Sequence, residues 1–254
     1  MPVVTNSPGP ADVFWMAHDG LPRQAPGSVA TTELLLGLAA PLPDRPRILD
    51  IGCGTGAASL PLAAATGGEV VAVDTHAPFL DRLRSEARAA GLAERIETLD
   101  AAMQDLPLPA GGTDLLWAEG SAYLMGFDAA LAQWRRLLAP DGVLVLTEAV
   151  WTTPQPAAGA RAFWDPAYPG MRSTAANAAA AEAAGWTVRA TYLLPDSDWA
   201  AYYGPLADRI DALRARGVDP AVLDEVAREI DVRRAHGDDY GYAGYVLRPH
   251  GRAK

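Results

Sequence analysis

The segment that most constrains this chain is residues 47–56, in which a short apolar run breaks into closely spaced glycines. An Ala- and Leu-rich stretch with helical periodicity follows it. The pattern predicts a strand, a glycine loop and a helix. In an open α/β sheet such a loop lies at the carboxyl end of the first strand, where glycines let a ligand approach the backbone and the helix N-terminus presents unpaired N–H groups. We therefore expect the ligand site at this loop.

Strand-like and helix-like patterns alternate after the loop. This alternation is typical of parallel strands joined by right-handed helical crossovers on both faces of a sheet. The loops at the carboxyl ends of such strands would converge on residues 52–56. The predicted strands of this region are residues 48–51, 69–74, 95–99, 114–117 and 142–147.

The flanking segments differ from this core. Residues 11–27 form an arm ahead of a helix expected at 28–38, and residues 151–170 combine prolines with large aromatics, which favours an ordered insertion over a flexible linker. We expect one catalytic unit in three parts: an N-terminal arm and helix that cover the site (1–45), a ligand-binding core (46–150), and a cap insertion with the C-terminal completion of the same domain (151–254). The remaining predicted elements are helices at 171–184, 196–216 and 219–237 and strands at 186–194 and 240–247.

The composition disfavours several classes of function. The formal net charge of -10 argues against nucleic-acid binding through counterion release. One cysteine and four scattered histidines provide neither a disulfide framework nor a metal cluster. The chain shows no secretory pattern at its start and no run that reaches the roughly 18 to 20 apolar residues of a membrane span. We expect a cytoplasmic protein whose partner is a small molecule rather than nucleic acid, membrane or metal. A homodimer is compatible with this expectation.

The spacing of the glycines narrows the choice of ligand. Residues 52–56 follow the pattern G-x-G-x-G, and Ala57 stands where the dinucleotide fingerprint has its third glycine, which some variants permit. No Gly-Lys-Ser/Thr follows, so a P-loop is excluded. Asp74 ends the next predicted strand about 20 residues further on, where a carboxylate accepts hydrogen bonds from a ribose. A dinucleotide and another adenosine ligand both remain open at this point.

Several motifs together resemble those of class I S-adenosylmethionine-dependent methyltransferases. The matches run in the family's order over residues 48–147, and the first is nearly residue for residue. The chain is most similar to the small-molecule branch of ubiquinone- and menaquinone-biosynthesis-type enzymes. The resemblance implies an α/β, Rossmann-like, seven-stranded and mostly parallel sheet with helices on both faces, an antiparallel last strand and a small aromatic-rich cap. The matching segments are residues 48–56, 70–74, 103–108, 114–120 and 137–144.

The resemblance also implies S-adenosyl-L-methionine as cofactor, with S-adenosyl-L-homocysteine as product. The backbone of the glycine loop is expected to face the methionine part, Asp74 the ribose and Thr75 the adenine edge, and the Met103 N–H is expected to bond to the adenine. Arg23 of the arm is a candidate partner for a carboxylate. The predicted cofactor-binding residues are Arg23, Asp50, Gly52, Cys53, Gly54, Asp74, Thr75, Ala102 and Met103.

One position departs from the family pattern. Many relatives carry an aspartate that accepts from the adenine amino group, and Ala102 stands there in this chain. Asp100 lies two residues earlier, on the same nominal face of the strand, and is a candidate substitute.

For methyl transfer from a sulfonium, the protein must mainly position the acceptor and exclude water. It must also remove a proton if the acceptor atom carries one. We predict Glu119 as the catalytic residue, because it follows an apolar strand and should project near the methyl group. A structural hydrogen-bond acceptor for the cofactor arm is its alternative role. His18 and His76 are weaker candidates, and no neighbour in sequence would activate Cys53 as a nucleophile.

Aromatic residues are concentrated in segments expected to cover the strand ends. Their rings would enclose a planar or cationic acceptor through stacking and cation–π contacts, although a single aromatic residue is more often part of the core. The predicted substrate-binding residues are Trp15, Tyr123, Trp151, Trp199 and Tyr203.

Three functions stay open. The first is transfer of a methyl group from S-adenosylmethionine to oxygen, nitrogen or activated carbon of a small molecule. The alternative is a non-catalytic S-adenosylmethionine-binding regulatory or scaffold protein. The third is a nicotinamide-dependent oxidoreductase.

Overall fold

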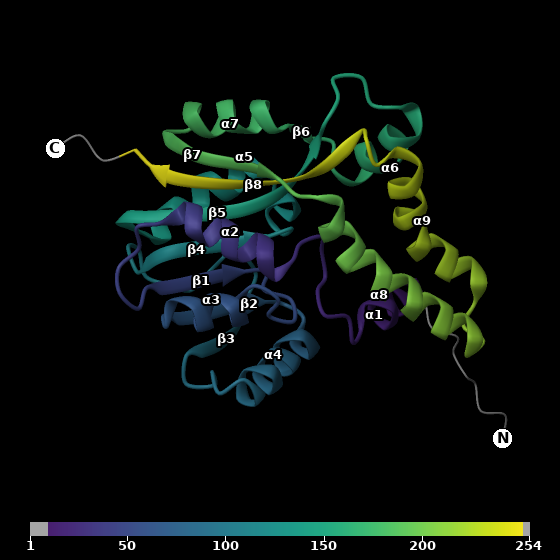
Figure 1. Ribbon diagram of the computed structural model, residues 1–254, viewed down its shortest axis with the longest axis horizontal. Helices are drawn as coiled ribbons and strands as arrows, with labels where there is room; N and C mark the ends of the chain where they lie inside the picture. The colour runs from purple at the N-terminus through teal and green to yellow at the C-terminus, as the bar shows by residue number, and fades with distance from the viewer. Residues whose placement is uncertain (1–9, 251–254) are drawn as a thin grey trace.

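Apolar side chains on both faces of the central strands require a sheet that is covered on both sides. In β1 (Arg47–Ile51) and β4 (Thr113–Glu119) most side chains are buried, which is typical of parallel strands between two helical layers. The computed structural model, which describes residues 10–250, has this arrangement (Figure 1). The other strands are β2 (Glu69–Asp74), β3 (Ile96–Asp100), β5 (Leu138–Trp151), β6 (Arg172–Ser173), β7 (Trp186–Leu193) and β8 (Tyr240–Pro249).

The sheet has the strand order β3-β2-β1-β4-β5-β8-β7, and the two-residue β6 pairs with the end of β5. The strands from β3 to β5 run parallel, whereas β8 is antiparallel to both β5 and β7. The direction of winding reverses between β1 and β4, and such a switch point leaves a crevice at the carboxyl ends of the strands. The predicted Rossmann-like sheet of seven strands in a row, with its antiparallel last strand, is confirmed.

Helices from the two ends of the chain contribute to both layers and to the cap. The helices are α1 (Pro10–His18), α2 (Val29–Ala39), α3 (Ser59–Thr66), α4 (Ala77–Ala89), α5 (Phe127–Trp134), α6 (Ala158–Ala167), α7 (Thr174–Ala183), α8 (Asp196–Ala215) and α9 (Pro220–His236), with short 3-10 turns at Ala122–Leu124 and Arg135–Leu137.

Each face of the sheet has its own apolar core. One core packs α5 and α7 against the sheet around Leu131, Trp134 and Trp186. The opposite core packs α2, α3 and α4 around Leu35 and Leu62. These two layers hold the parallel strands rigidly and so fix the positions of the loops at their carboxyl ends.

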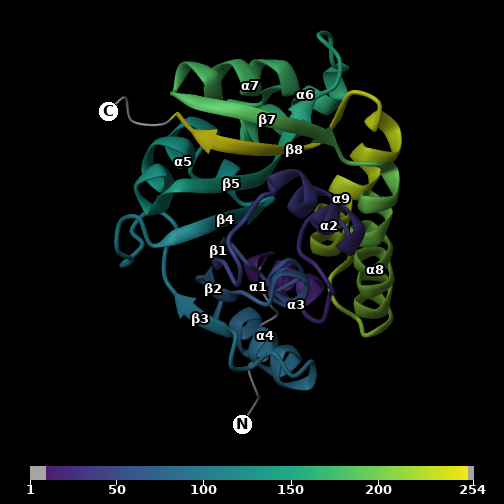
Figure 2. The same ribbon diagram turned by 60° about the vertical axis from the view of Figure 1, so that its left-hand side comes forward.

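A third core lies in a helical cap at one end of the sheet. Figures 1 and 2 show α1, α6, α8 and α9 gathered there, although α1 begins the described chain and α9 lies near its end. Trp199, Tyr202 and Leu206 of α8 pack in this core with Tyr240 and Tyr242 of β8. The expectation of an aromatic-rich cap is confirmed.

Several element boundaries differ from the predicted ones, and two of these differences have a clear cause. The fifth strand was expected at 142–147, but β5 continues to Trp151 because Glu148, Ala149 and Val150 keep pairing with β8. The helix expected from residue 171 begins at Thr174, because the Ser173 side chain caps it by accepting a hydrogen bond from Ala176 N–H. The insertion at 151–170 is ordered and contains α6.

Candidate functional site

The glycine loop after β1 adopts a conformation that needs glycine. Gly52 has a φ of +73°, and a Cβ atom at this position would lie 2.4 Å from the Cβ atom of Ser121. Gly56 has a φ of +88°, and a Cβ atom there would lie 2.2 Å from a methyl carbon of Leu83. Backbone strain and steric overlap therefore exclude larger residues at both positions.

Backbone hydrogen bonds tie the loop to β2. The N–H groups of Gly52 and Cys53 donate to the Val73 carbonyl oxygen at 2.8 and 2.9 Å. The Gly54 N–H donates to Oδ2 of Asp74 at 2.9 Å, and the His76 N–H donates to Oδ1 of the same carboxylate at 2.9 Å. Two backbone amides thus fix the Asp74 carboxylate, which keeps its remaining lone pairs for a ligand.

Asp50 lies under the loop and is almost fully buried. The Ser59 hydroxyl donates to its Oδ2 atom at 2.5 Å, linking the end of β1 to the start of α3. Burial raises the pKa of Asp50 to about 7, the Ser59 hydrogen bond opposes the shift, and the charges of Glu119 and Asp74 add to it. The carboxyl groups of Asp50, Asp74 and Glu119 therefore make this part of the molecule electronegative.

A cavity opens at the carboxyl ends of β1, β2 and β4, next to the loop. All the predicted cofactor-binding residues line it except Ala102, whose neighbour Ala101 does so. Asp100 is exposed and is not among the lining residues. Glu119, Gly120 and Ser121 line the cavity from the end of β4, and Phe79 and Leu124 were lining residues that the motifs did not indicate.

Glu119 accepts hydrogen bonds from three side chains. Arg23 donates from a guanidinium nitrogen to Oε2 at 3.0 Å, and Oε1 accepts from the Thr32 hydroxyl at 2.7 Å and the Trp117 indole N–H at 3.0 Å. Both members of the Arg23–Glu119 ion pair are nearly buried. In this arrangement the carboxylate anchors the arm to the core, and its predicted role as a base stays a prediction.

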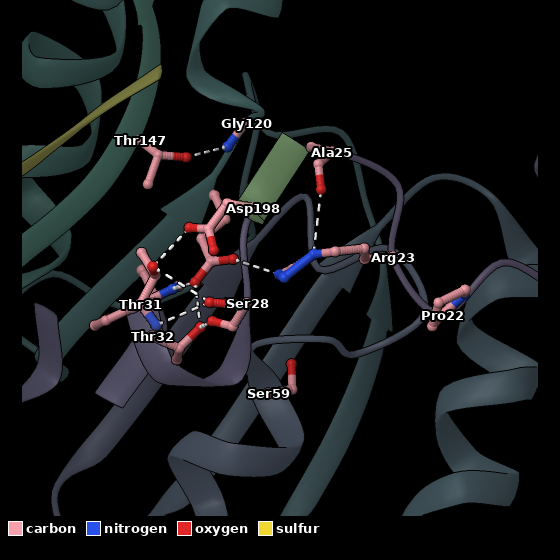
Figure 3. Close-up of polar contacts among 12 residues, drawn as sticks. Pro22, Arg23, Ala25, Ser28, Thr31, Thr32, Ser59, Gly120, Thr147 and Asp198 are labelled. Carbon is pink, nitrogen blue, oxygen red and sulfur yellow. Dashed lines mark hydrogen bonds and ion pairs between the residues drawn. The ribbon is translucent and has the colours of Figure 1, made fainter. Parts of the chain in front are cut away.

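The same arm is also tied to the cap (Figure 3). The Thr31 hydroxyl donates to Oδ2 of the buried Asp198 in α8 at 2.6 Å, and the Gly27 N–H donates to the Asp198 carbonyl oxygen at 3.2 Å. These contacts join three elements that lie far apart in the sequence. We name this group the arm clamp; it consists of Arg23, Thr31, Thr32, Glu119 and Asp198.

None of the predicted substrate-binding aromatics lines this cavity, and Trp199 and Tyr203 line a second cavity between α8 and α9. Trp15 stacks on His76 with ring centroids 3.9 Å apart and also contacts Phe79, which lines the cavity. Tyr123 packs beside the cap core with Trp151, Trp199 and Tyr203. Their roles toward a substrate stay predictions.

Two acidic side chains near the cap were missed from the sequence, one fully buried and one partly exposed. Glu148 is fully buried in β5, and burial raises its pKa to about 8. Glu229 of α9 accepts a hydrogen bond from the Tyr202 hydroxyl at 3.1 Å, and burial raises its pKa to about 7. Nε2 of His18 lies 3.0 Å from the same hydroxyl, and burial lowers the pKa of His18. An acidic residue inside an otherwise apolar strand was the signal that could have revealed Glu148.

The other single-residue expectations concern Cys53 and the histidines. Burial raises the pKa of the Cys53 thiol well above its ordinary value, so the group is a poor nucleophile.

Within residues 10–250 no group of three or more His, Cys, Asp or Glu side chains is arranged to hold a metal ion. Among these residues no helix is both long and apolar enough to cross a membrane.

The sequence has relatives of assigned activity. Residues 48–142 match the family model of a methyltransferase domain. The chain is 36% identical over 125 residues to the dimethylglycine N-methyltransferase of Parasynechococcus marenigrum (strain WH8102), a match covering 49% of this chain and 45% of that protein. It is 38% identical over 117 residues to the nocamycin O-methyltransferase of Saccharothrix syringae, covering 44% of this chain and 41% of that protein. The chain thus spans less than half the length of either relative.

The fold has solved counterparts over nearly its whole length. The S-adenosylmethionine-dependent methyltransferase from Thiobacillus denitrificans, solved in complex with S-adenosyl-L-homocysteine, superposes with a TM-score of 0.82 at 19% identity, covering 94% of this chain and 98% of that chain. Residues 48–142 thus match a methyltransferase domain by sequence, and the chain shares its Rossmann-like fold with this solved S-adenosylmethionine-dependent methyltransferase.

Proposed function

We propose that the protein binds S-adenosylmethionine in the cavity beside the glycine loop and transfers its methyl group to a small-molecule acceptor. The observation that carries the proposal is the Asp74 carboxylate, which two backbone amides hold at the cavity wall next to Gly54. A carboxylate fixed in this way is suited to accept hydrogen bonds from both hydroxyls of a ribose. The methyltransferase-domain match over the same residues supports the assignment.

The remaining lining residues fit the other parts of this cofactor. The loop residues Gly52, Cys53 and Gly54 would hold the methionine part, with the electronegative surroundings of Asp50 favouring its cationic groups. Thr75 and Met103 would lie along the adenine. Arg23 would contribute through the arm, because its guanidinium is already paired with Glu119.

The bound cofactor would supply an electrophilic methyl group that needs no further activation. The protein's part is then to orient the acceptor and keep water out. The arm clamp serves this purpose, since it holds the arm against both the end of β4 and α8. Glu119 is proposed either to remove a proton from the methyl acceptor or to position the arm. Glu119→Gln separates the two roles. If Glu119 removes the proton, the variant should transfer methyl groups more slowly, and if Glu119 positions the arm, the variant should mainly bind the cofactor more weakly.

The nature of the acceptor is left broad by the comparisons. The named relatives methylate nitrogen in one case and oxygen in another, so oxygen, nitrogen and activated carbon are all retained. Membership of the ubiquinone- and menaquinone-biosynthesis-like branch, a homodimer and a cytoplasmic location stay predictions from the sequence.

Calorimetric titration tests the cofactor assignment. S-adenosylmethionine and S-adenosylhomocysteine should bind the wild-type protein, and Asp74→Ala should weaken binding at least about tenfold, because a charged hydrogen-bond partner of the ribose is lost. Asp74→Asn keeps an acceptor for the Gly54 N–H and serves as the variant that preserves the loop. Asp231→Ala, at an exposed site on α9, is the matched control and should bind as wild type does.

The outcomes separate the open functions. Unchanged affinity in both Asp74 variants would remove the ribose assignment. Binding of NADH but neither S-adenosyl compound would favour a nicotinamide-dependent oxidoreductase. Binding of the S-adenosyl compounds without turnover on any metabolite pool would favour the non-catalytic regulatory or scaffold protein.

A further inference from the structure

The segment that joins β3 to β4 lines the cavity beside the glycine loop without forming a helix or a strand. Residues 101–112 consist of turns and irregular backbone, and Ala101 and Met103 of this segment line the cavity. Backbone groups outside helices and sheets are not held by a regular ladder of hydrogen bonds. Other contacts must therefore fix the position of this cavity wall.

Two side chains at the end of α5 and in the turn after it hold the segment by its carbonyl oxygens. The Trp134 indole N–H donates to the Met103 carbonyl oxygen at 3.2 Å. The Arg136 guanidinium donates to the carbonyl oxygens of Leu106 and Leu108 at 2.8 and 2.9 Å. Trp134 is 1% exposed and belongs to the apolar core of this layer, so its indole is a rigid anchor.

Packing does not fill the space between the segment and α5. A separate cavity of about 210 Å³ lies there, and atoms on its walls have no partners across it. The hydrogen bonds that cross from α5 and its following turn therefore carry the positioning that packing supplies elsewhere. The residues around this cavity are Met103, Gln104, Leu106, Ala132, Gln133, Trp134, Arg136 and Leu137.

Hydrogen bonds fix the peptide units on both sides of Met103. The Ala102 carbonyl oxygen, which shares a planar unit with the Met103 N–H, accepts from the Asp105 N–H at 3.1 Å. The Met103 carbonyl oxygen, in the next unit, accepts from Trp134. Among the described residues none accepts a hydrogen bond from the Met103 N–H, and Met103 lines the cavity beside the glycine loop. This donor is thus held in place and available to a ligand.

We propose that Trp134 is a positioning residue for adenine recognition, because its indole holds Met103 so that the Met103 N–H meets N1 of the adenine ring. The inference rests on the proposed function and adds to it a residue outside the cavity lining, which acts through Met103. Without the indole N–H, the segment gains conformations in which the Met103 N–H faces elsewhere. Ordering the segment again on binding would then cost affinity.

Calorimetry with two compounds that differ only in the base tests the inference. The probes are S-adenosylhomocysteine, whose N1 accepts a hydrogen bond, and S-inosylhomocysteine, whose N1 carries a hydrogen and cannot accept one. The wild-type protein should bind the adenosyl compound at least about tenfold more tightly, because the inosyl compound leaves two donors facing each other. Trp134→Phe keeps an aromatic ring without the N–H and should reduce this preference at least about threefold, through weaker binding of the adenosyl compound.

Trp186→Phe is the matched control. Trp186 is 0% exposed and lies in the same apolar core as Trp134, but its indole N–H has no hydrogen-bond partner within the described chain. This variant should keep the wild-type preference for the adenosyl compound. Arg136→Ala, which removes the two bonds beyond Met103, should also reduce the preference, and it keeps the test available if Trp134→Phe does not fold.

The outcomes separate the inference from the proposed function. An unchanged preference in Trp134→Phe would overturn the inference even if both affinities fall, because a purely structural role weakens both compounds alike. An equal reduction in Trp186→Phe, or equal binding of the two compounds by the wild-type protein, would overturn it as well. Failure of the wild-type protein to bind S-adenosylhomocysteine at all refutes the proposed function instead.

Discussion

Two glutamates in this protein differ in their hydrogen bonding because their surroundings differ. Glu119 and Glu148 are both glutamates near the carboxyl ends of neighbouring strands. Glu119 accepts from three side chains, whereas Glu148 has an oxygen without a partner within the described chain. The first carboxylate is therefore suited to anchoring, whereas burial raises the pKa of the second to about 8.

The raised pKa of Glu148 predicts a dependence of stability on pH. In the folded protein the pKa is about 8, whereas the ordinary value is 4.5. Between these pH values the unfolded chain releases a proton that the folded protein retains, so the free energy of unfolding falls as pH rises, by at most roughly 1.4 kcal/mol per pH unit. Below about pH 4.5 this contribution is fully present, and above about pH 8 it is lost.

Glu148→Gln should remove this part of the pH dependence. Urea unfolding between pH 5 and pH 8 should give a shallower loss of stability for the variant than for the wild-type protein. Asp50 and Glu229, whose pKa values are also raised, contribute equally to both curves. Parallel curves for the two proteins would contradict a buried, protonated Glu148.

At the scale of elements, the arm between α1 and α2, together with the first turn of α2, connects the end of β4 to α8. Arg23 and Thr32 bind Glu119 at the end of β4, and Thr31 binds Asp198 at the start of α8. The Ser28 side chain caps α2 by accepting a hydrogen bond from the Thr31 N–H at 3.1 Å. This cap fixes the start of α2 and so the positions of Thr31 and Thr32. The arm therefore couples the cavity beside the glycine loop to the cap.

Breaking the ion pair of the clamp should be costly. Arg23→Ala leaves the nearly buried Glu119 without its cation, and the free energy of unfolding should fall by roughly 3 kcal/mol. The double variant Arg23→Ala/Glu119→Gln should recover part of this loss, because the uncompensated charge is gone. Arg88→Ala, at an exposed site on α4, is the control and should change stability little. Additive effects of the two substitutions would contradict the coupling.

At the scale of the whole molecule, the features that depend on local sequence patterns could be predicted from the sequence. Alternating strand and helix signals, with glycines at 52–56, were enough for the sheet, its covered faces and the place of the cavity. The antiparallel last strand followed from the family resemblance. The end of β5 was predicted too early, because its pairing with β8 depends on residues about a hundred positions away.

Contacts between distant segments could not be predicted from the sequence. Nothing in the spacing indicates that Arg23 would pair with Glu119, or that Thr31 would bind Asp198. The raised pKa of Glu148 likewise arises mainly from burial, which only the folded chain provides. Such properties depend on tertiary packing, which local patterns do not encode.

The function proposed for this molecule is transfer of a methyl group from S-adenosylmethionine to a small molecule. The most direct measurement is incubation of the protein with methyl-labelled S-adenosylmethionine and fractionated pools of small metabolites, followed by mass spectrometry. We predict S-adenosylhomocysteine together with a product that carries the labelled methyl group, and loss of both with Asp74→Ala. Binding of S-adenosylmethionine without either product from any pool would contradict the claim.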